Sequence, residues 1–385
     1  MKRFFVYFFA FSFFITLISC ASENDVFPEV PLSTSTADVD LPNPISILTD
    51  AANNQIIVLN SNVDVFYNQG SLAVIFVDAT DTDAPVLTAT SIIAAPNYGT
   101  QIASNGTTLY IPFREALFDD PNEDILATYT IASGSITEGV QTQGGENPFG
   151  IVVRNNGDLL VVADNALHLY NSTLDRTASI DLTTATDADI EDTNAERVED
   201  IVFDETNLRA FISNGNGNIF IVDLTSLELT HVIQGTLDTR GMATDGTYIY
   251  AVNGGDEPSL WVFDPNQVSA TTSPPEAIDD STLVIDVVDL GHDPQGLVID
   301  TTGNRAYVAN SDDRTISVID LNLFEQIDLI SLKDQDTGFK EGVDPFSLAL
   351  GTFNSVPYVF VANFGSNTIS VINTQTLNVV ASFPD

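Results

Sequence analysis

Short apolar runs rich in Val, Ile, Tyr and Phe recur from residue 43 to the end of the 385-residue chain. Clusters of turn residues separate these runs, for example at residues 302–304 (Thr-Gly-Asn) and 311–313 (Ser-Asp-Asp). Short apolar runs bounded by Gly, Asn, Asp and Ser are typical of β-strands. The pattern therefore predicts an all-β fold over residues 43–385.

The runs are organised in repeats, most clearly near the C-terminus. The first runs of the last two units start 51 residues apart, at Asp293 and Asp344, and the later runs of the two units also match. Weaker copies of the same order of runs bring the number of units to seven. The other five units contain the apolar runs at residues 44–48, 108–112, 147–153, 199–204 and 240–245.

Each unit holds four short runs, and this number decides the architecture. A four-stranded unit cannot bury both faces of its sheet alone, so the units must stack on their neighbours round a ring. The sequence thus predicts a seven-bladed β-propeller of four-stranded blades. No unit is split between the two termini, because residues 377–383 can form the outer strand of the last blade. We therefore expect the ring to close by packing between the first and last blades alone.

The motif Tyr307-Val-Ala-Asn310 followed by Thr315-Ile-Ser-Val-Ile-Asp320 resembles the YVTN-type repeat of YncE-like bacterial β-propellers. The resemblance covers about nine-tenths of the chain and weakens in the first two units. It implies a central channel and a top face built from the loops that enter strand one and leave strand two of each blade. It does not imply one activity, since related propellers include binding proteins, surface-layer components and lactonase-like enzymes.

Composition excludes one class of partner. The chain has 54 acidic and 12 basic residues, a formal net charge of −42, although 44% of it is hydrophobic. Its 24 Phe and 10 Tyr indicate a folded protein and not a disordered acidic tail. Binding to nucleic acid draws most of its affinity from Lys and Arg, so no nucleic-acid partner is expected. An acidic, lysine-poor surface suits solubility in saline surroundings.

The N-terminus has a basic start and an apolar stretch from Phe4 to Ile18, which is typical of a secretory signal. The ending Leu17-Ile18-Ser19-Cys20 resembles the bacterial lipobox, which implies cleavage before Cys20 and diacylation of its thiol. Cys20 is the single cysteine of the chain, so no disulfide accounts for it. The alternative is an ordinary signal peptide with an incidental cysteine.

These features predict a signal peptide (residues 1–19), a lipidated cysteine with a flexible tether (residues 20–42) and the propeller (residues 43–385). The tether is rich in Ser, Thr, Asp and Pro and shows no periodicity. Ala21 follows the cysteine, and the resemblance to enterobacterial sorting implies delivery to the bacterial outer membrane. We expect a monomer attached to the membrane through its lipid anchor, with the propeller either periplasmic or exposed at the cell surface.

Alignment of the units places polar residues in two rings. The ring before the first strands, which includes Asn43 and Asn147, is expected near the channel mouth. It would form a polar funnel for a small ligand or a cation. Turn chemistry is the alternative, because Asn and Asp bond their own backbone and tolerate left-handed conformations. The ligand-binding candidates at the mouth are Glu199, Asp200, Arg240, His292, Asp293, Asp344 and Arg114. The second ring follows strand two and consists of Asn60, Asp164, Asn214, Asn253, Asn310 and Asn363.

Lactonase-like hydrolysis would need a general acid or base and an electrophile that steadies the developing oxyanion. His292, Glu199 and Arg240 would then have to converge on one ligand atom at the mouth. The other two histidines, His168 and His231, lie inside predicted strands and are expected to be partly exposed. No residue is assigned as catalytic.

The sequence suggests no cofactor, with calcium as the one possibility left open. It has no cysteine after Cys20 and no pair of histidines at ligand spacing, so no transition-metal site is expected. Oxygen ligands for calcium cluster in three loops, which contain residues 119–124, residues 187–192 and residues 279–280. None follows the EF-hand pattern, and a solvated acidic loop is the alternative. The calcium candidates are Asp187, Asp189, Glu191 and Asp192.

Together these features lead to three hypotheses. The first is a lipid-anchored envelope propeller that acts as a non-catalytic binding or scaffold protein for a protein or glycan partner. The alternative is a lactonase-like hydrolase with its active site at the channel mouth. The third is a purely structural envelope component, which would have no concave polar pocket.

The lipobox assignment predicts that Cys20→Ala abolishes acylation and moves the protein from the membrane fraction to the soluble fraction. Cell fractionation and labelling with a lipid precursor measure both effects. Persistence of the variant in the membrane fraction would contradict the assignment.

Overall fold

The structure is a computed structural model that describes most of the predicted propeller. The described residues are 28–35, 39–64, 67, 69–114, 124–183, 198–215, 217–234, 238–268, 276–279, 283–333 and 339–384. The predicted signal peptide, Cys20 and the four calcium candidates at residues 187–192 lie outside this part of the chain, so their assigned roles stay predictions.

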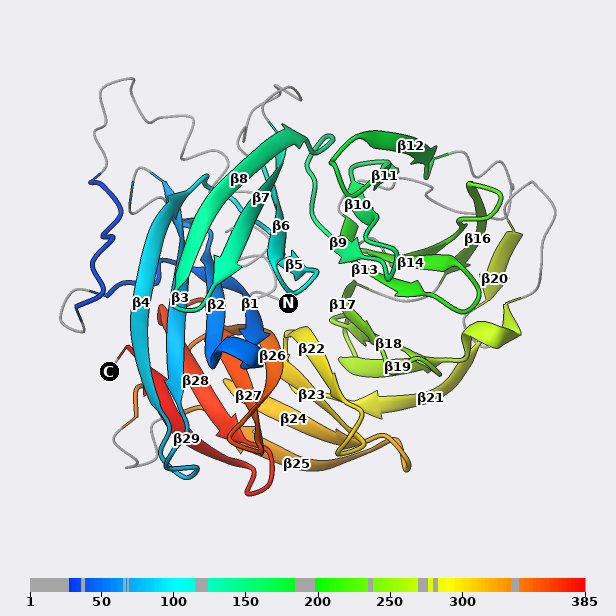
Figure 1. Cartoon of the computed structure of the whole chain (residues 1–385). Helices are drawn as coiled ribbons and strands as arrows, with labels where there is room; N and C mark the ends of the chain where they lie inside the picture. Colours follow the sequence, from blue (N-terminus) through cyan, green and yellow to red (C-terminus); the bar gives the residue numbers. More distant parts are fainter. Residues whose placement is uncertain are drawn as a thin grey trace.

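Seven sheets stand round a central axis, and the four antiparallel strands of each blade follow one another in chain order (Figure 1). This confirms the predicted seven-bladed β-propeller of four-stranded blades. The described residues contain two short 3-10 turns, η1 (Ala51–Asn53) and η2 (Pro265–Gln267), and no α-helix.

The strands follow the blades in chain order. Blade 1 contains β1 (Pro44–Asp50), β2 (Gln55–Asn60), β3 (Gly70–Asp78) and β4 (Val86–Ala95), and blade 2 contains β5 (Ala103–Ser104), β6 (Thr108–Phe113), β7 (Ile125–Ala132) and β8 (Ser135–Gln143). Blade 3 contains β9 (Ile151–Val153), β10 (Leu159–Ala163), β11 (Ala166–Tyr170) and β12 (Arg176–Asp181), and blade 4 contains β13 (Val198–Asp204), β14 (Arg209–Asn214), β15 (Asn218–Asp223) and β16 (Glu228–Gln234). Blade 5 contains β17 (Thr239–Thr244), β18 (Ile249–Asn253), β19 (Ser259–Phe263) and β21 (Val284–Asp289). Blade 6 contains β22 (Pro294–Asp300), β23 (Arg305–Asn310), β24 (Thr315–Asp320) and β25 (Glu325–Ser331), and blade 7 contains β26 (Pro345–Phe353), β27 (Val356–Asn363), β28 (Thr368–Asn373) and β29 (Asn378–Phe383).

Blade 4 carries a fifth strand that the repeat pattern did not predict. β20 (Glu276–Asp279) comes from the connection between β19 and β21 of blade 5 and pairs in parallel with β16. The strand β16 is apolar and almost fully buried at Val232 and Ile233. An uncovered strand edge is a site of unwanted pairing, so β20 both covers the edge of blade 4 and links blade 5 to it.

The start of the innermost strand has the same geometry in most blades. Asn43, Asp293 and Asp344 have φ angles of 52°, 51° and 50° and lie directly before β1, β22 and β26. The pairing register then shifts within the first residues of each of these strands. Asn and Asp adopt the left-handed conformation more readily than other side chains. Turn geometry thus accounts for this ring of Asn and Asp residues.

The asparagine at the end of strand two forms hydrogen bonds with strand three of the same blade. The Nδ2 of Asn310 donates hydrogen bonds to the hydroxyls of Thr315 and Ser317 at 3.0 and 2.9 Å. In blade 7, Asn363 donates to Thr368 and Ser370 at 3.1 and 2.9 Å. A buried amide needs such partners, which explains why the repeat couples Asn with the Thr-Ile-Ser sequence that follows it.

Adjacent blades are joined by a repeated hydrogen bond. A side chain five residues before the terminal Asn of strand two donates to a backbone carbonyl between strands three and four of the next blade. The same bond joins the last blade to the first, so the ring closes as its interior junctions do. The donors and acceptors are Gln55 to Ala132 (3.1 Å), Arg209 to Val268 (3.0 Å), Arg305 to Thr374 (2.8 Å) and Tyr358 to Thr82 (2.7 Å).

Blades 7 and 1 also share one hydrophobic cluster, which includes Phe360 of β27 and Val58 of β2. The ring therefore closes by packing and by side-chain hydrogen bonds, whereas the sequence predicted packing alone. Just before β1, Leu41 is fully buried, and the hydroxyl of Tyr67 donates a hydrogen bond to Asp40. Burial and this bond raise the pKa of Tyr67 to about 12. Residues 39–42 thus contact blade 1 before the first strand begins.

Every arginine of the described chain contacts a neighbouring blade or the segment leading into it. Arg154 in blade 3, for example, lies 4.8 Å from the ring centre of Phe203 in blade 4. A guanidinium offers five donors and a flat face, which suits such junctions. The other contacts are Arg114 with Phe149, Arg176 with Gln143, Arg209 with Val268, Arg240 with Asp293, Arg305 with Thr374 and Arg314 with Glu341.

Removing the closing hydrogen bond tests whether the last junction equals an interior one. Tyr358→Phe should lower the free energy of unfolding by about 1 kcal/mol, as expected for one buried hydrogen bond. Tyr170→Phe is the interior comparison: its hydroxyl donates from strand three of blade 3 to the Gln143 carbonyl of the preceding blade at 2.7 Å, and it also accepts from Arg176. Urea unfolding should give similar losses for both variants, and a Tyr358→Phe protein as stable as the wild type would contradict the assignment.

Candidate functional site

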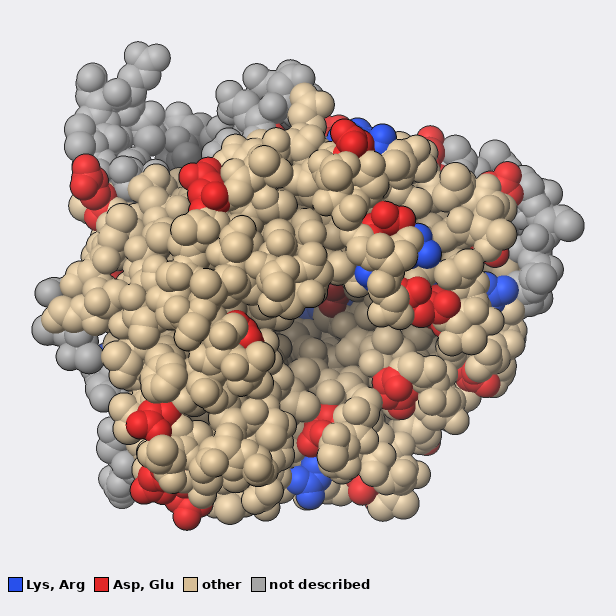
Figure 2. Space-filling model, in the orientation of Figure 1, with Lys and Arg blue, Asp and Glu red and all other residues tan. Residues whose placement is uncertain are grey.

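The centre of the ring is hollow on the face seen in Figure 2, and charged side chains are visible inside the hollow. The innermost strands of the blades surround it (Figure 1). Two positions after the left-handed turn residue, these strands begin with a mixed ring of side chains. Its members are Ile45, Thr100, Phe149, Glu199, Arg240, Gln295 and Phe346.

Arg240 binds two carboxylates at the channel mouth. Its Nη2 lies 2.8 Å from Oδ2 of Asp238, and its Nη1 lies 2.5 Å from Oδ1 of Asp293 in the next blade. Burial opposes the charge of Arg240, but the two aspartates outweigh that effect and raise its pKa. Of the predicted residues, Arg240 and Asp293 are therefore brought together, and Arg240 neutralises carboxylates of its own chain.

A second charged group lies where blades 2, 3 and 4 meet. The guanidinium of Arg114 lies 5.6 Å from the ring centre of Phe149. Burial lowers the pKa of Arg114, while the charges of Asp164, Glu199 and Asp124 oppose that shift. The structure thus places the predicted residues Glu199 and Arg114 in one electrostatic cluster.

His292 forms its hydrogen bonds with the carboxylate of Asp313. Its imidazole is 78% exposed, with Nδ1 3.0 Å from Oδ2 of Asp313 in the same blade. The backbone N–H of His292 donates to the same carboxylate at 2.8 Å. Although burial raises the pKa of Asp313, these bonds and the charge of His292 lower it overall. His292 and Arg240 therefore have different hydrogen-bonding partners, although the charges of both act on Asp312.

Acidic groups of the neighbouring blades 6 and 7 interact at the channel mouth. Burial raises the pKa of Asp344, and the charges of Asp312 and Asp293 raise it further, against the opposing charge of Arg314. Burial and the charges of Asp293 and Asp313 raise the pKa of Asp312, against the opposing charges of His292 and Arg240. Asp344, one of the residues predicted at the channel mouth, belongs to this group of acidic side chains. Asp312 belongs to the turn between strands two and three, and in the sequence this turn is recognisable only as the boundary between two apolar runs.

Asp200 occupies a different position from the one expected. It lies inside β13 and not in the turn before it, because the left-handed turn residue comes three positions earlier in the aligned blades. Its Oδ1 accepts from Nε2 of Gln101 in blade 2 at 3.1 Å, and its Oδ2 accepts from the backbone N–H of Met242 in blade 5 at 2.8 Å. Burial raises the pKa of Asp200 to about 6. This carboxylate therefore links blades across the channel.

Side chains at the position equivalent to Asp200 also form hydrogen bonds between blades elsewhere in the ring. Oγ of Ser46 accepts from the Ile102 N–H of blade 2 at 3.1 Å, and Oε1 of Gln101 accepts from the Ile151 N–H of blade 3 at 2.8 Å. Glycine occupies the position in blades where the next strand lies too close for a side chain. A Cβ on Gly241 would lie 2.7 Å from the carbonyl oxygen of Gln295.

The predicted second ring does not form a funnel at the mouth. Asn60, Asn214, Asn310 and Asn363 are fully buried inside their blades. Their side chains follow the inward face of strand two, which the repeat alignment did not distinguish from a turn position. Asp164, the exception, is half-buried and acts on Arg114.

The two strand histidines are buried, which corrects the expectation of partial exposure. His168 is 7% exposed with its Nδ1 2.9 Å from the Ser179 hydroxyl, and His231 is 1% exposed. Burial, aided by the charge of Arg176, lowers the pKa of His168 to about 4. A base this weak does not activate a serine at neutral pH.

Within the described part of the chain, no cluster of three or more His, Cys, Asp or Glu side chains could hold a metal ion. The calcium candidates Asp187, Asp189, Glu191 and Asp192 lie outside that part, so calcium stays a prediction. Among the described residues there is also no helix long and apolar enough to cross a membrane.

Comparison with known proteins shows the fold and no more. No family model matches the sequence, and no curated protein matches it. Among solved structures, the chain is similar to one titled Kuenenia stuttgartiensis Hydrazine Synthase, with a TM-score of 0.63 and 14% sequence identity. The match covers 87% of this chain and 97% of that one. At this identity the likeness supports the propeller architecture and says nothing about activity.

The raised pKa of Asp200 predicts a pH-dependent stability. Its folded pKa of about 6 exceeds the ordinary 3.8, so its contribution is fully present below pH 3.8 and is lost as the pH rises through 6. Between pH 4 and 7 the wild type should lose up to about 3 kcal/mol relative to Asp200→Asn. Denaturant unfolding at several pH values measures the difference. The exposed Asp175→Asn variant should keep the wild-type decline, and an Asp200→Asn protein that declines equally would contradict the assignment.

Proposed function

We propose that this protein is a lipid-anchored binding or scaffold protein of the bacterial cell envelope. It binds a protein or glycan partner at the channel mouth and performs no catalysis. The β-propeller fold supports a binding or scaffold role, because its loops gather side chains from seven blades at one opening. The lipobox-like sequence around Cys20 supports the anchor, and the acidic composition suits a saline location outside the cytoplasm.

The observation that supports the non-catalytic interpretation is that the positive groups at the mouth are held by carboxylates of the same chain. Arg240 binds Asp238 and Asp293, and the exposed His292 binds Asp313. A hydrolase needs its acid, base and electrophile within reach of one reacting atom. Here Arg240 and His292 belong to a polar rim of paired charges, which is suited to holding a partner.

The rim also offers chemistry for recognition. Phe149 and Phe346 are half-buried in the ring that contains Glu199 and Gln295. The Phe346 ring lies 6.2 Å from that of Phe364, so its position is supported by packing. Aromatic side chains beside carboxylates and amides are typical of surfaces that bind proteins or sugars.

A capture experiment with paired variants tests this proposal. The protein, immobilised in detergent, is incubated with envelope extracts and with a glycan array. Glu199→Gln and Asp344→Asn change the mouth, while Glu325→Gln removes an exposed charge on the outer strand β25. We expect each mouth variant to reduce capture of the bound partner at least about fivefold, the loss of roughly one charge-assisted hydrogen bond.

The control variant Glu325→Gln should capture the partner as the wild type does. Loss of capture in the control but not in the mouth variants would place the partner elsewhere and contradict the proposal. Hydrolysis of a bound glycan or lactone by the wild type would contradict its non-catalytic part.

A further inference from the structure

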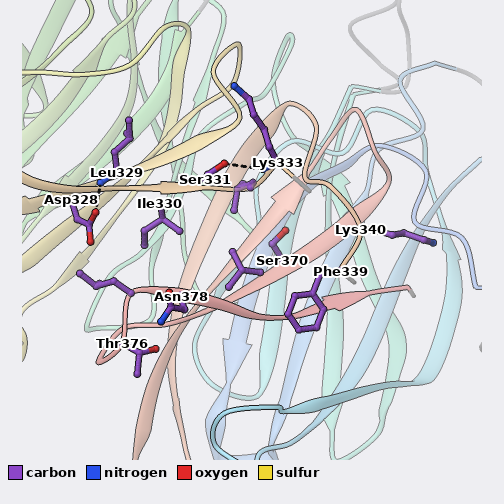
Figure 3. Close-up of a pocket in the computed structure, with 13 residues that line it drawn as sticks. Asp328, Leu329, Ile330, Ser331, Lys333, Phe339, Lys340, Ser370, Thr376 and Asn378 are labelled. Atoms are coloured by element: carbon purple, nitrogen blue, oxygen red, sulfur yellow. Dashed lines mark hydrogen bonds between the residues drawn. The ribbon is translucent and has the colours of Figure 1, made fainter. Parts of the chain in front are cut away.

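A cavity of about 330 Å³ opens at the outer edge of the ring, between blades 6 and 7 (Figure 3). One wall is the outer strand β25 with the residues that follow it, and the other is formed by β28, β29 and the turn between them. No residue predicted at the channel mouth lines it. The cavity is therefore a separate feature from the proposed binding face.

Apolar side chains form the floor of the cavity, but most of its lining surface is polar. Ile330 and Leu332 are buried, while Leu377 and Val379 are partly buried and pack against the same cluster. The Asp328 carboxylate, the Thr376 hydroxyl and the Asn378 amide also line it. Oδ1 of Asp328 accepts the Leu329 N–H at 2.8 Å, which holds the carboxylate in place at the edge. A ligand in this space would meet carbon on one side and hydrogen-bonding groups on the other.

Both lysines that follow Lys2 in the sequence, Lys333 and Lys340, line this one cavity. The described arginines all contact neighbouring blades or the segments leading into them; both lysines are exposed, and the charge of Lys333 also acts on Asp313. Their backbone N–H groups donate to Ser331 and Ser382. The ammonium groups extend outward on two sides of the cavity in Figure 3. A lysine stem rotates freely, so both charges can turn to an anion at the entrance.

We propose that this cavity binds an acidic sugar, a pyranose that carries a carboxylate. The sugar's apolar C–H face would lie on Ile330 and Leu377, and its hydroxyls would bond Asp328, Thr376 and Asn378. Its carboxylate would pair with Lys333 or Lys340. Pockets of about this volume hold small ligands, and one or two sugar rings fit the space.

The composition of the site argues against other anions. An acidic peptide would pair with the lysines but has no ring hydroxyls to bond Asp328, Thr376 and Asn378. A neutral sugar would use the floor and the polar groups but would gain nothing from the lysines. Distant acidic groups have little effect at physiological salt, where charges more than about 8 Å apart are screened.

The proposal does not depend on the function assigned to the channel mouth, and the two can fail separately. Binding of trigalacturonate to the full-length protein in detergent is measured by calorimetry, with a neutral galactose trisaccharide and a triglutamate peptide as comparison ligands. We expect trigalacturonate to bind most tightly. Comparable binding of triglutamate would show a general anion site and would overturn the sugar assignment, as would comparable binding of the neutral trisaccharide.

Variants then locate the site. The double variant Lys333→Gln/Lys340→Gln should weaken trigalacturonate binding about tenfold or more, while Arg176→Gln, which removes an exposed cation from the outer strand of blade 3, should leave it unchanged. Asn378→Ala should weaken binding without altering its dependence on salt. Thermal unfolding checks that each variant is folded. Undetectable binding to the wild type, or equal binding to the double lysine variant, would overturn the proposal.

Discussion

Hydrogen bonds from the side chains of one blade to the backbone of the next are the interaction on which this ring depends. An outer set runs from the start of strand two to the turn beyond strand three, as from Arg305 to Thr374. An inner set runs along the channel, as from the Ile102 N–H to Ser46. Buried backbone groups that lack a partner are costly, so each blade completes the structure of its neighbour. The junction between blades 7 and 1 uses the same kind of bond, which allows closure without exchange of a strand.

The inner set has consequences for the channel. Where glycine occupies the position of Asp200, the next strand approaches closely, and where a polar side chain occupies it, a hydrogen bond spans the gap. Asp200 does this with a carboxylate, whose burial disfavours its charged form. Both of its oxygens accept from N–H groups, which only a side chain with two acceptor oxygens can do. The channel wall is therefore held together in part by a group whose contribution changes with pH.

Charge is distributed unevenly between structure and surface. The described arginines contact neighbouring blades or the segments leading into them, through carbonyls, carboxylates or aromatic rings. Most of the acidic excess remains at the surface, where it keeps the protein soluble. Positive charge is consequently scarce on the outside, and the two lysines beside one cavity stand out against that background.

Much of this protein could be read from its sequence because its signals are local. Apolar runs and turn residues define the strands, and the recurring Asn and Asp residues mark the left-handed turns at Asn43, Asp293 and Asp344. The similarity of the last two units was enough to predict seven stacked blades. The site was only partly predictable: Arg240, Asp293, Asp344, Arg114 and Glu199 lie at the mouth, whereas His292 points to solvent and Asp200 lies within a strand.

The tertiary structure alone decided what depends on contacts between distant segments. The hydrogen bond from Gln101 to Asp200 joins residues of different blades, and no repeat pattern reveals such a pair. The face of strand two that carries Asn310 is buried because another blade packs on it, so the alignment of repeats could not separate it from a turn. The parallel pairing of β20 and the cavity between blades 6 and 7 arise in the same way. Sequence periodicity determines which residues form strands, and the packing of the ring determines which of them meet.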